Sequence, residues 1–271
     1  MKLSAVIGVM IASLALTAAT VTEYQVRSEA MDKDVKVNVI LPDSYADNDG
    51  RSYPVMYLYH GAGGNHAAWP YGLPECQKEA DRFQTIIVCP DGALSWYFDS
   101  PVDPAVKYET FCGTELVAWT DANFRTVRDR NARATCGLSM GGHGAMWIAI
   151  NNLDTFASAI ALSGGVDIRP FPGNWGLNEI LGTQEEHMDN WENFTVINAA
   201  KELKDGELAI SLDCGIDDFF FQVNLDLHNQ LLEQGVKHDY IVRPGAHTGE
   251  YWNNAIVYAM AFADKQFSKV R

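Results

Sequence analysis

Hydrophobic and polar positions alternate in two different ways along the first half of the chain. Residues 23–27 and 35–41 alternate apolar with polar side chains, as antiparallel strands with one solvated face do. Later apolar runs are short and continuous, which is typical of strands covered on both faces. These runs lie at 55–59, 86–89, 132–136, 157–162, 208–212 and 240–242.

Segments with apolar residues at helical spacing lie between these runs. Residues 108–122, 140–152, 219–234 and 251–267 carry apolar side chains at helical spacing, and Gly235 ends the third of them. Such alternation of strands and helices predicts an α/β fold with a mostly parallel sheet, antiparallel strands at the N-terminal side and helices on both faces. Ligands of such sheets bind at the carboxyl ends of the strands.

Residues 163–191 break this pattern. Glycine and proline punctuate the segment, which also holds Phe171, Trp175 and Trp191. Because it follows the carboxyl end of a predicted strand, we expect a lid-like, substrate-facing insertion.

The first 19 residues differ from the rest. Lys2 precedes an almost wholly apolar run to Leu16, and Thr17, Ala18 and Ala19 are small. This pattern predicts a signal peptide, so that the mature protein is a single domain over 20–271 in the periplasm or outside the cell. A buried first strand or helix is the weaker interpretation, and the run is short for the ~20 residues of a permanent membrane span.

Composition excludes several kinds of partner. The chain has 271 residues, a net charge of -15 and a pI near 4.7, which argue against nucleic acid and anionic membranes as ligands. The five cysteines leave at least one thiol free, and the pairing of Cys76 with Cys112 stays open. The sequence makes no prediction about oligomeric state.

No metal or cofactor is expected. Cys-x-x-Cys and His-x-x-x-His spacings do not occur in the sequence. Asp91, Asp99 and Asp103 are calcium candidates, but Pro101 and Pro104 indicate turns there.

The segment from Gly137 to Gly141 reads Gly-Leu-Ser-Met-Gly, the pattern of a nucleophile elbow. In such an elbow a strand turns sharply into a helix and exposes a serine hydroxyl, here that of Ser139. The predicted strand before it and helix after it agree with this interpretation. An ordinary glycine-rich turn is the alternative.

A serine hydroxyl needs a general base to act as a nucleophile. In elbow hydrolases the order along the chain is serine, acid, histidine. His247 follows the last predicted strand, in a loop at its carboxyl end, and is the expected base. His228 falls inside a helix and His238 precedes its strand, so both are expected to be solvated.

The acid is expected in the loop after the strand at 208–212. Asp217 and Asp218 both lie there, and spacing alone does not decide between them. Asp213 is a weaker third candidate.

An oxyanion needs two fixed N–H donors. We expect them to be the backbone amides of Met140, directly after the serine, and of Ala62 in the loop His60-Gly-Ala-Gly-Gly64. A phosphate-binding loop is the alternative for this second segment, but the Gly-Lys-Ser/Thr that would follow is missing.

Several motifs occur in a characteristic order. They are His60-Gly-Ala-Gly-Gly-Asn-His66 with Trp69, Ser95-Trp-Tyr97 with Asp99-Ser-Pro-Val-Asp103, Gly137-Leu-Ser-Met-Gly-Gly142, Cys214-Gly-Ile-Asp-Asp-Phe219 and Pro244-Gly-Ala-His247. Together they resemble the branch of α/β hydrolases that holds tributyrin, feruloyl and acetylxylan esterases, esterase D and the antigen 85 mycolyltransferases.

The resemblance implies an α/β-hydrolase fold and points to Asp218, the aspartate before phenylalanine, as the triad acid. Relatives often carry a tryptophan two residues after the triad histidine, where this chain has Gly249. This difference concerns the pocket wall beside His247.

The resemblance and the predicted signal peptide together imply an exported serine esterase of the acetyl or feruloyl type, acting on plant polysaccharide or short-chain esters. Trp69, Trp96 and Trp175 lie near carboxyl strand ends and are candidates for stacking on substrate, although each can equally pack in the core. The alternatives are a thioesterase of the S-formylglutathione hydrolase kind and a non-catalytic carbohydrate-binding relative.

Overall fold

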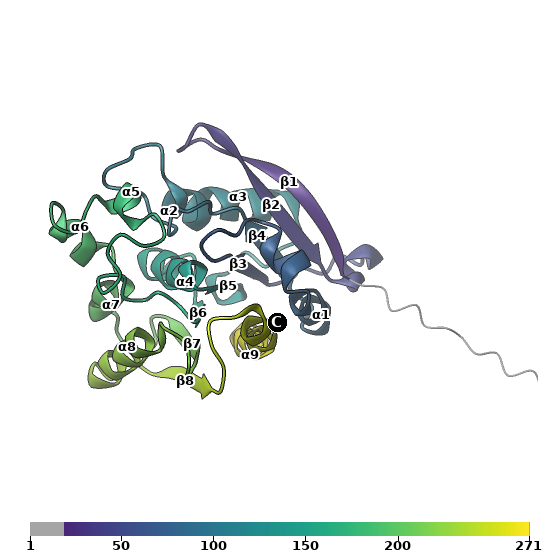
Figure 1. Ribbon diagram of the computed structural model, residues 1–271. Coiled ribbons are helices and arrows are strands. Elements are labelled where there is room, and N and C mark those ends of the chain that lie inside the picture. The colour runs from purple at the N-terminus through teal and green to yellow at the C-terminus, as the bar shows by residue number, and fades with distance from the viewer. Residues whose placement is uncertain (1–18, 271) are drawn as a thin grey trace, which may run out of the picture.

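The computed structural model describes residues 19–270, which fold around one eight-stranded sheet (Figure 1). The strand order is β1-β2-β4-β3-β5-β6-β7-β8, and only the pairs β1/β2 and β2/β4 are antiparallel. This confirms the predicted, mostly parallel sheet. The strands are β1 (Thr20–Ser28), β2 (Lys33–Leu41), β3 (Val55–Tyr59), β4 (Ile86–Pro90), β5 (Arg133–Leu138), β6 (Ser158–Leu162), β7 (Ala209–Gly215) and β8 (His238–Arg243).

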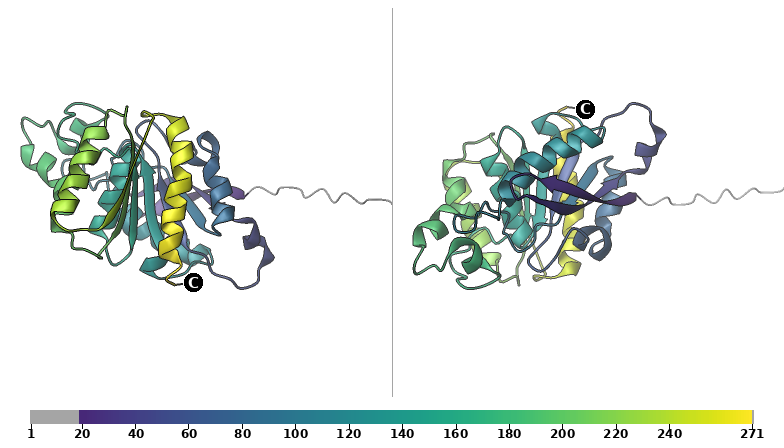
Figure 2. Two further views of the ribbon diagram at one scale, coloured as in Figure 1. Left: turned by 90° about the horizontal axis from the view of Figure 1, so that it is seen from below. Right: turned by 90° about the horizontal axis from the view of Figure 1, so that it is seen from above.

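Helices cover both faces of the sheet (Figure 2). They are α1 (Glu75–Arg82), α2 (Tyr108–Thr110), α3 (Leu116–Asn123), α4 (Met140–Asn151), α5 (Leu177–Leu181), α6 (Met188–Asn193), α7 (Val196–Ala199), α8 (Phe221–Glu233) and α9 (Gly249–Phe267). One apolar core lies between the sheet and α3, α4 and α8, and a second lies between the sheet and α1 and α9. Alternate residues of β3 face the two cores, as the period of a strand requires: Tyr57 and Tyr59 contribute to the first, Met56 and Leu58 to the second.

The helix expected over 108–122 is interrupted. A π-helical turn, Phe111–Glu115, joins α2 to α3. Within it, a Cβ on Gly113 would lie only 2.7 Å from the Asn152 side chain at the end of α4, so the glycine permits this close approach. The sequence pattern did not predict α1 or the short helices α5 to α7.

The two cysteines whose pairing was open lie in different cores. Cys76 packs in the core beneath α1 and α9, and Cys112 packs in the core on the other face of the sheet. Both are buried free thiols, as are Cys89, Cys136 and Cys214. Burial raises the pKa of the Cys76 thiol to about 12, which keeps it protonated and unreactive.

His228 and His238 are less solvated than the sequence predicts. Both rings are half-buried, and their Nδ1 and Nε2 atoms are hydrogen-bonded to each other at 2.7 Å. The His228 ring also stacks on Tyr240 of β8, with ring centroids 4.1 Å apart. A helix face and a neighbouring strand therefore satisfy two polar rings that appear unrelated in the sequence.

Segment 163–191 is tied to the body of the domain. The Trp96 indole N–H donates to the Trp175 carbonyl at 3.0 Å, and the Ser100 hydroxyl donates to the Ile180 carbonyl at 2.6 Å. Trp191 is fully buried and donates to the Gly182 carbonyl at 2.9 Å. The segment thus packs as part of the domain, above the carboxyl ends of the strands.

The predicted signal peptide, except for Ala19, lies outside the described residues. Within 19–270 no helix has the length and apolar character needed to cross a membrane. The same residues contain no cluster of three His, Cys, Asp or Glu side chains arranged to hold a metal ion. Of the three calcium candidates, Asp99 accepts hydrogen bonds from the Thr110 amide and hydroxyl, at 3.0 and 2.6 Å.

Candidate active site

Ser139 lies at the sharp turn between β5 and α4. Its backbone has φ 57° and ψ -120°, a conformation that residues other than glycine rarely adopt and that costs about 1–3 kcal/mol. Hydrogen bonds on both sides hold it there: its N–H donates to the Leu162 carbonyl at 2.9 Å, and its carbonyl accepts from the Gly165 N–H at 3.2 Å. The strained turn presents the hydroxyl to a pocket.

Two glycines of the motif are required because a side chain at either position would clash with the backbone. A Cβ on Gly137 would lie 2.2 Å from the carbonyl oxygen of Gly141, and a Cβ on Gly141 would lie 2.4 Å from the carbonyl oxygen of Tyr59. Both contacts are with backbone atoms that cannot move aside. The close packing of α4 against β3 and β5 therefore depends on both positions having no side chain.

Ser139, His247 and Asp218 lie in one hydrogen-bonded line. The Oγ of Ser139 is 2.9 Å from Nε2 of His247, and Nδ1 of His247 is 3.0 and 2.9 Å from the two carboxylate oxygens of Asp218. Because an ionised carboxylate only accepts, Nδ1 of His247 carries the proton and Nε2 is free to accept one from the serine. The Asp218 side chain is fully buried and that of His247 is mostly buried.

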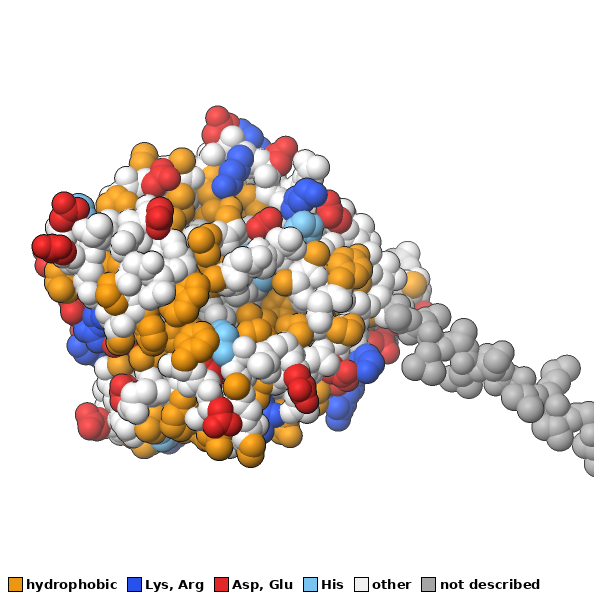
Figure 3. Space-filling view, in the orientation of Figure 1, with side chains coloured by type: hydrophobic (Ala, Val, Ile, Leu, Met, Phe, Trp, Pro, Cys, Tyr) orange, Lys and Arg blue, Asp and Glu red, His pale blue; other side chains and the backbone are white. Residues whose placement is uncertain are grey.

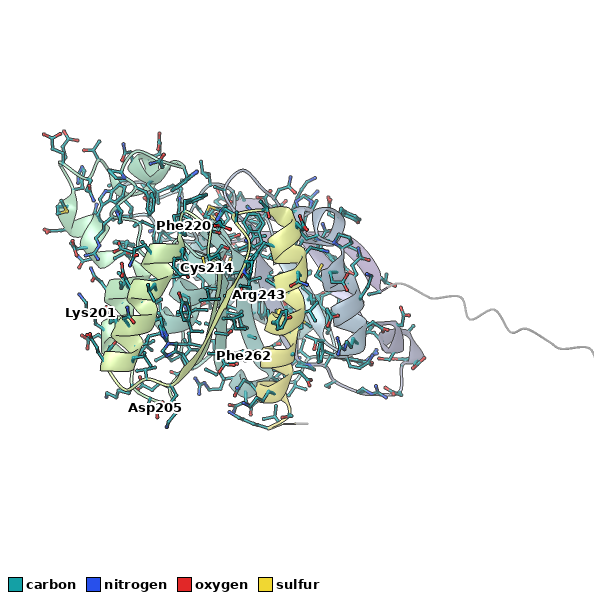
Figure 4. The ribbon with its side chains drawn as sticks, turned by 60° about the horizontal axis from the view of Figure 1, so that its bottom comes forward. Lys201, Asp205, Cys214, Phe220, Arg243 and Phe262 are labelled. Atoms are coloured by element: carbon teal, nitrogen blue, oxygen red, sulfur yellow. The ribbon has the colours of Figure 1, made fainter. Side chains whose placement is uncertain are left out.

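The three candidate carboxylates, one at the end of β7 and two in the loop between β7 and α8, lie in different surroundings. Asp218 points at His247 and also accepts a hydrogen bond from the Phe220 N–H at 2.8 Å. Asp217 is exposed to solvent. Asp213 is buried within β7, where it binds Arg243 and Tyr251. Of the three acids predicted from the sequence, only Asp218 contacts the imidazole. Figure 4 shows Phe220 near Cys214 at this end of the sheet, and Asp205 at the opposite end.

The backbone amides of Ala62 and Met140 are both near the serine in the fold. Ala62 lines the same pocket as Ser139, and Met140 is the first residue of α4. Within residues 19–270 neither N–H donates to a protein acceptor. Both are therefore available to an anionic oxygen, and the amide of Met140 lies at the positive end of a helix dipole.

The side chain of His60 braces the loop that carries Ala62. Its Nε2 accepts from the Gly92 N–H at 2.8 Å, so the proton is on Nδ1, which donates to the Gly61 carbonyl at 2.8 Å. The ring is almost fully buried. These bonds fix the peptide before Ala62 and limit the directions its N–H can take.

A pocket of about 490 Å³ opens above the serine. Figure 3 shows hydrophobic side chains gathered around a hollow in this face of the molecule. The volume lies in the range of small-molecule sites, ~300–1,000 Å³. The lining residues are Gly61, Ala62, Gly64, Ala68, Gly72, Leu73, Leu138, Ser139, Trp175, Phe219, His247, Gly249 and Trp252.

Of the three tryptophans expected to contact substrate, only Trp175 lines the pocket. Trp69 is buried in the core beneath α1, where its indole N–H donates to the Tyr59 carbonyl at 2.8 Å. Trp96 is buried behind Trp175 and donates to its carbonyl. This corrects the expectation for Trp69 and Trp96: nearness to a strand end in sequence did not distinguish a pocket wall from the core behind it.

Sequence reasoning missed two aromatic walls of the site. Phe219 packs on His247, with ring centroids 4.2 Å apart, and stacks on Trp175. Trp252 of α9 meets the His247 ring edge to face at 4.7 Å. Trp252 thus supplies an aromatic wall beside His247 although residue 249 is glycine. The position of Phe219 directly after Asp218 was the available sequence signal.

Comparisons with known proteins indicate the family of the chain. The family model described as "Putative esterase" matches residues 28–263. Esterase Rv1288 of Mycobacterium tuberculosis is 37% identical over 149 residues, which cover 54% of this chain and 32% of that protein, so the match spans about a third of the relative's length. The acetyl esterase of Caldicellulosiruptor saccharolyticus is 26% identical over 262 residues, covering 88% of this chain and 96% of that protein.

Solved structures share the fold. A ferulic acid esterase superposes with a TM-score of 0.79 at 28% identity, covering 93% of this chain and 100% of that one. An S-formylglutathione hydrolase of Staphylococcus aureus superposes with a TM-score of 0.78 at 21% identity, covering 92% and 100%, and shows the fold alone. The chain therefore belongs to this esterase family, a family of carboxylic-ester hydrolases within the α/β-hydrolase superfamily.

Proposed function

We propose that the chain is an exported serine esterase in which Ser139, His247 and Asp218 form the catalytic triad. The observation that carries the proposal is the hydrogen-bonded line through these three side chains, 2.9 Å from serine to imidazole and 2.9 Å from imidazole to carboxylate. That line ends at a strained serine in an apolar pocket, which is the arrangement nucleophilic attack on a carbonyl requires.

The reaction has two displacements. His247 takes the proton of Ser139 as the hydroxyl attacks the ester carbonyl, and the amides of Ala62 and Met140 hold the oxyanion. The imidazolium, stabilised by Asp218, then gives its proton to the departing alcohol and leaves an acyl-serine. Water, activated by the same imidazole, attacks the acyl-serine, and the acid is released as Ser139 recovers its proton.

The proposed substrates are neutral carboxylic esters, either small molecules or acyl groups carried on a polysaccharide. The names of the relatives, an acetyl esterase and a ferulic acid esterase, support acetyl and feruloyl groups as candidates. Export rests on the apolar N-terminal run and the small residues up to Ala19. Secretion of the full chain from a bacterial host, followed by N-terminal sequencing, tests it: the mature protein should begin near Thr20.

A thioesterase of the S-formylglutathione hydrolase kind is the alternative. Its substrate carries two carboxylates, which need cationic partners. Among the described residues that line the pocket none is lysine or arginine, and the net charge of the chain is -15. Both observations favour a neutral ester over this anionic thioester.

Replacement of the serine tests the proposed function and separates it from a non-catalytic, carbohydrate-binding role. Ser139→Ala should lower kcat on p-nitrophenyl acetate by ~10³-fold or more. Ser268→Ala, at the exposed end of the chain, is the matched control and should keep full activity. Equal turnover by Ser139→Ala and the unmodified protein would refute the assignment.

A further inference from the structure

Two glycines in the pocket wall have no structural need to be glycine. A Cβ on Gly72 would meet nothing within 4 Å, and a Cβ on Gly249 would meet only the Leu73 Cδ2 atom at 3.4 Å, an ordinary contact. Neither residue has a positive φ. Gly137 and Gly141, in contrast, would clash with backbone. Both residues line the pocket where it is open to solvent, and the physical effect of their missing side chains is to leave space along this wall.

The space lies against one apolar wall. Leu73, Leu138 and Trp252 form this wall, and all three pack on the core beneath α1 and α9. The indole N–H of Trp252 already donates to the Ser163 hydroxyl at 3.1 Å, so it is not free for a ligand. Apart from Ser139 and His247, every side chain that lines the pocket is apolar, and the remaining lining positions are glycines.

A second part of the pocket wall, formed by Phe219 and Trp175, suits the alcohol half of an ester. The departing oxygen must lie within reach of His247, because this imidazole protonates it. Beside His247 lies Phe219, which is 51% exposed and stacks on Trp175 of the 163–191 segment. A group that leaves past these rings extends into solvent, as an alcohol on a polysaccharide must. The enclosed wall of Leu73 and Leu138 is then left for the acyl half.

We propose that Gly72 and Gly249 set the acyl-chain length, and that the pocket selects saturated aliphatic acyl groups longer than acetyl, from butyryl to octanoyl. This inference rests on the proposed esterase function and specifies the substrate of the same site, favouring longer aliphatic acyl groups over the acetyl and feruloyl candidates named above. Each methylene buried against the wall contributes ~0.8 kcal/mol, or about fourfold in kcat/KM. A feruloyl group would place a phenol hydroxyl among apolar side chains that offer it no hydrogen-bond partner.

The test measures kcat/KM on p-nitrophenyl acetate, butyrate, hexanoate and octanoate, and on methyl ferulate. The unmodified protein should prefer hexanoate to acetate by about tenfold or more and hydrolyse methyl ferulate poorly. Gly72→Val and Gly249→Val should each lower the ratio of octanoate to acetate by about tenfold or more. Glu250→Val, exposed on the same turn of α9 but facing a different cavity, is the matched control and should keep the ratio.

A variant that enlarges the pocket keeps the test decisive if a valine variant does not fold. Leu73→Ala removes part of the wall and should move the preferred acyl chain to a greater length. A second series, in which acetates of methyl, butyl and octyl alcohol replace the acyl series, should respond to the glycine variants by less than about twofold.

Acyl ratios that stay the same in all three pocket variants, or a response in the alcohol series alone, would overturn the inference while leaving the esterase function in place. If the unmodified protein hydrolyses none of these esters, the proposed function fails and the inference fails with it.

Discussion

The hydroxyl of Tyr251 donates a hydrogen bond of 2.5 Å to the carboxylate of Asp213. The second oxygen of Asp213 accepts from Arg243 at 2.6 Å. Asp213 lies in β7, just before the loop that carries Asp218, and Tyr251 lies in the first turn of α9, just after the loop that carries His247. The contact therefore joins the two loops from which the acid and the base of the triad project.

Asp213→Asn should destabilise the fold more than it impairs the chemistry. The uncharged amide leaves the mostly buried Arg243 without its ion-pair partner, at a cost of about 2 kcal/mol after discounting for the exposed part of the guanidinium. The folded variant should lose less than about tenfold in kcat/KM. Urea unfolding and ester hydrolysis, measured on the same preparation, check both parts. A severe loss of kcat with unchanged stability would instead place Asp213 in the chemistry.

Asp218→Asn should impair the chemistry more than it destabilises the fold. An amide at this position cannot hold Nδ1–H of His247 or stabilise the imidazolium, so kcat should fall by ~10³–10⁴-fold while the fold is kept. Asp217→Asn is the matched control, because its side chain is exposed and contacts nothing in the triad. Its kcat should change by less than about twofold. Similar losses in the two variants would contradict the assignment of the acid.

His143 should make the stability of the domain depend on pH. Burial among Phe98, Trp147 and Phe194 lowers the pKa of this imidazole to about 3. Its Nδ1 lies 3.2 Å from the Trp96 carbonyl oxygen. The unfolded chain takes up a proton at this histidine below pH ~6.5, whereas the folded chain stays neutral until about pH 3. Stability is thus full above pH ~6.5 and falls as the pH is lowered toward 3.

The comparison of pH 7.5 with pH 5.0 isolates this contribution. The unmodified protein should lose roughly 2 kcal/mol of unfolding free energy from His143 over this range. His143→Phe keeps a ring of similar size without a titrating group, and its loss should be smaller by that amount. Urea unfolding of both proteins at both pH values measures the difference. Equal losses would show that His143 does not titrate on unfolding.

The cysteines should not react with thiol reagents in the folded protein. All five are buried free thiols, and burial raises the pKa of every one of them. A thiol-reactive chromogenic disulfide should therefore label none rapidly in buffer and five in guanidinium chloride, with no reductant required. Fewer than five in the denatured protein would reveal a disulfide and contradict the separation of Cys76 from Cys112 by the sheet.

Most of the fold was predictable because its strands are covered on both faces. Continuous apolar runs such as 55–59 and 86–89 have few other interpretations, and each became a strand. The helices that the sequence did not predict have weak hydrophobic periodicity. Helix α1 is short and mostly polar, α5 follows a run of glycine and proline, and α6 and α7 have only six and four residues. Tertiary contacts such as those of Trp191 therefore decide the structure there.

The candidate site also contains residues that the sequence predicted and residues that it did not. Ser139, His247 and the loop that carries Asp217 and Asp218 were predictable because the order of strands forces these loops to the same edge of the sheet. The choice of Asp218 over Asp217 came only from the family resemblance. The pocket walls were not, since whether Trp69 or Trp252 faces the serine depends on side-chain directions that sequence spacing does not encode. The two glycines of the wall illustrate the point: the family resemblance linked Gly249 to the pocket wall, nothing in the sequence singled out Gly72, and the contacts around both show open space.

Covalent labelling tests the central claim most directly. The intact protein is treated with an alkyl fluorophosphonate, which reacts with activated serines, and the adduct is located by peptide mass spectrometry. The account predicts one adduct, on the peptide that contains Ser139, formed at least ~10²-fold more slowly in Asp218→Asn and absent from Ser139→Ala. Labelling of another serine, or of Ser139 at an unchanged rate without Asp218, would contradict it.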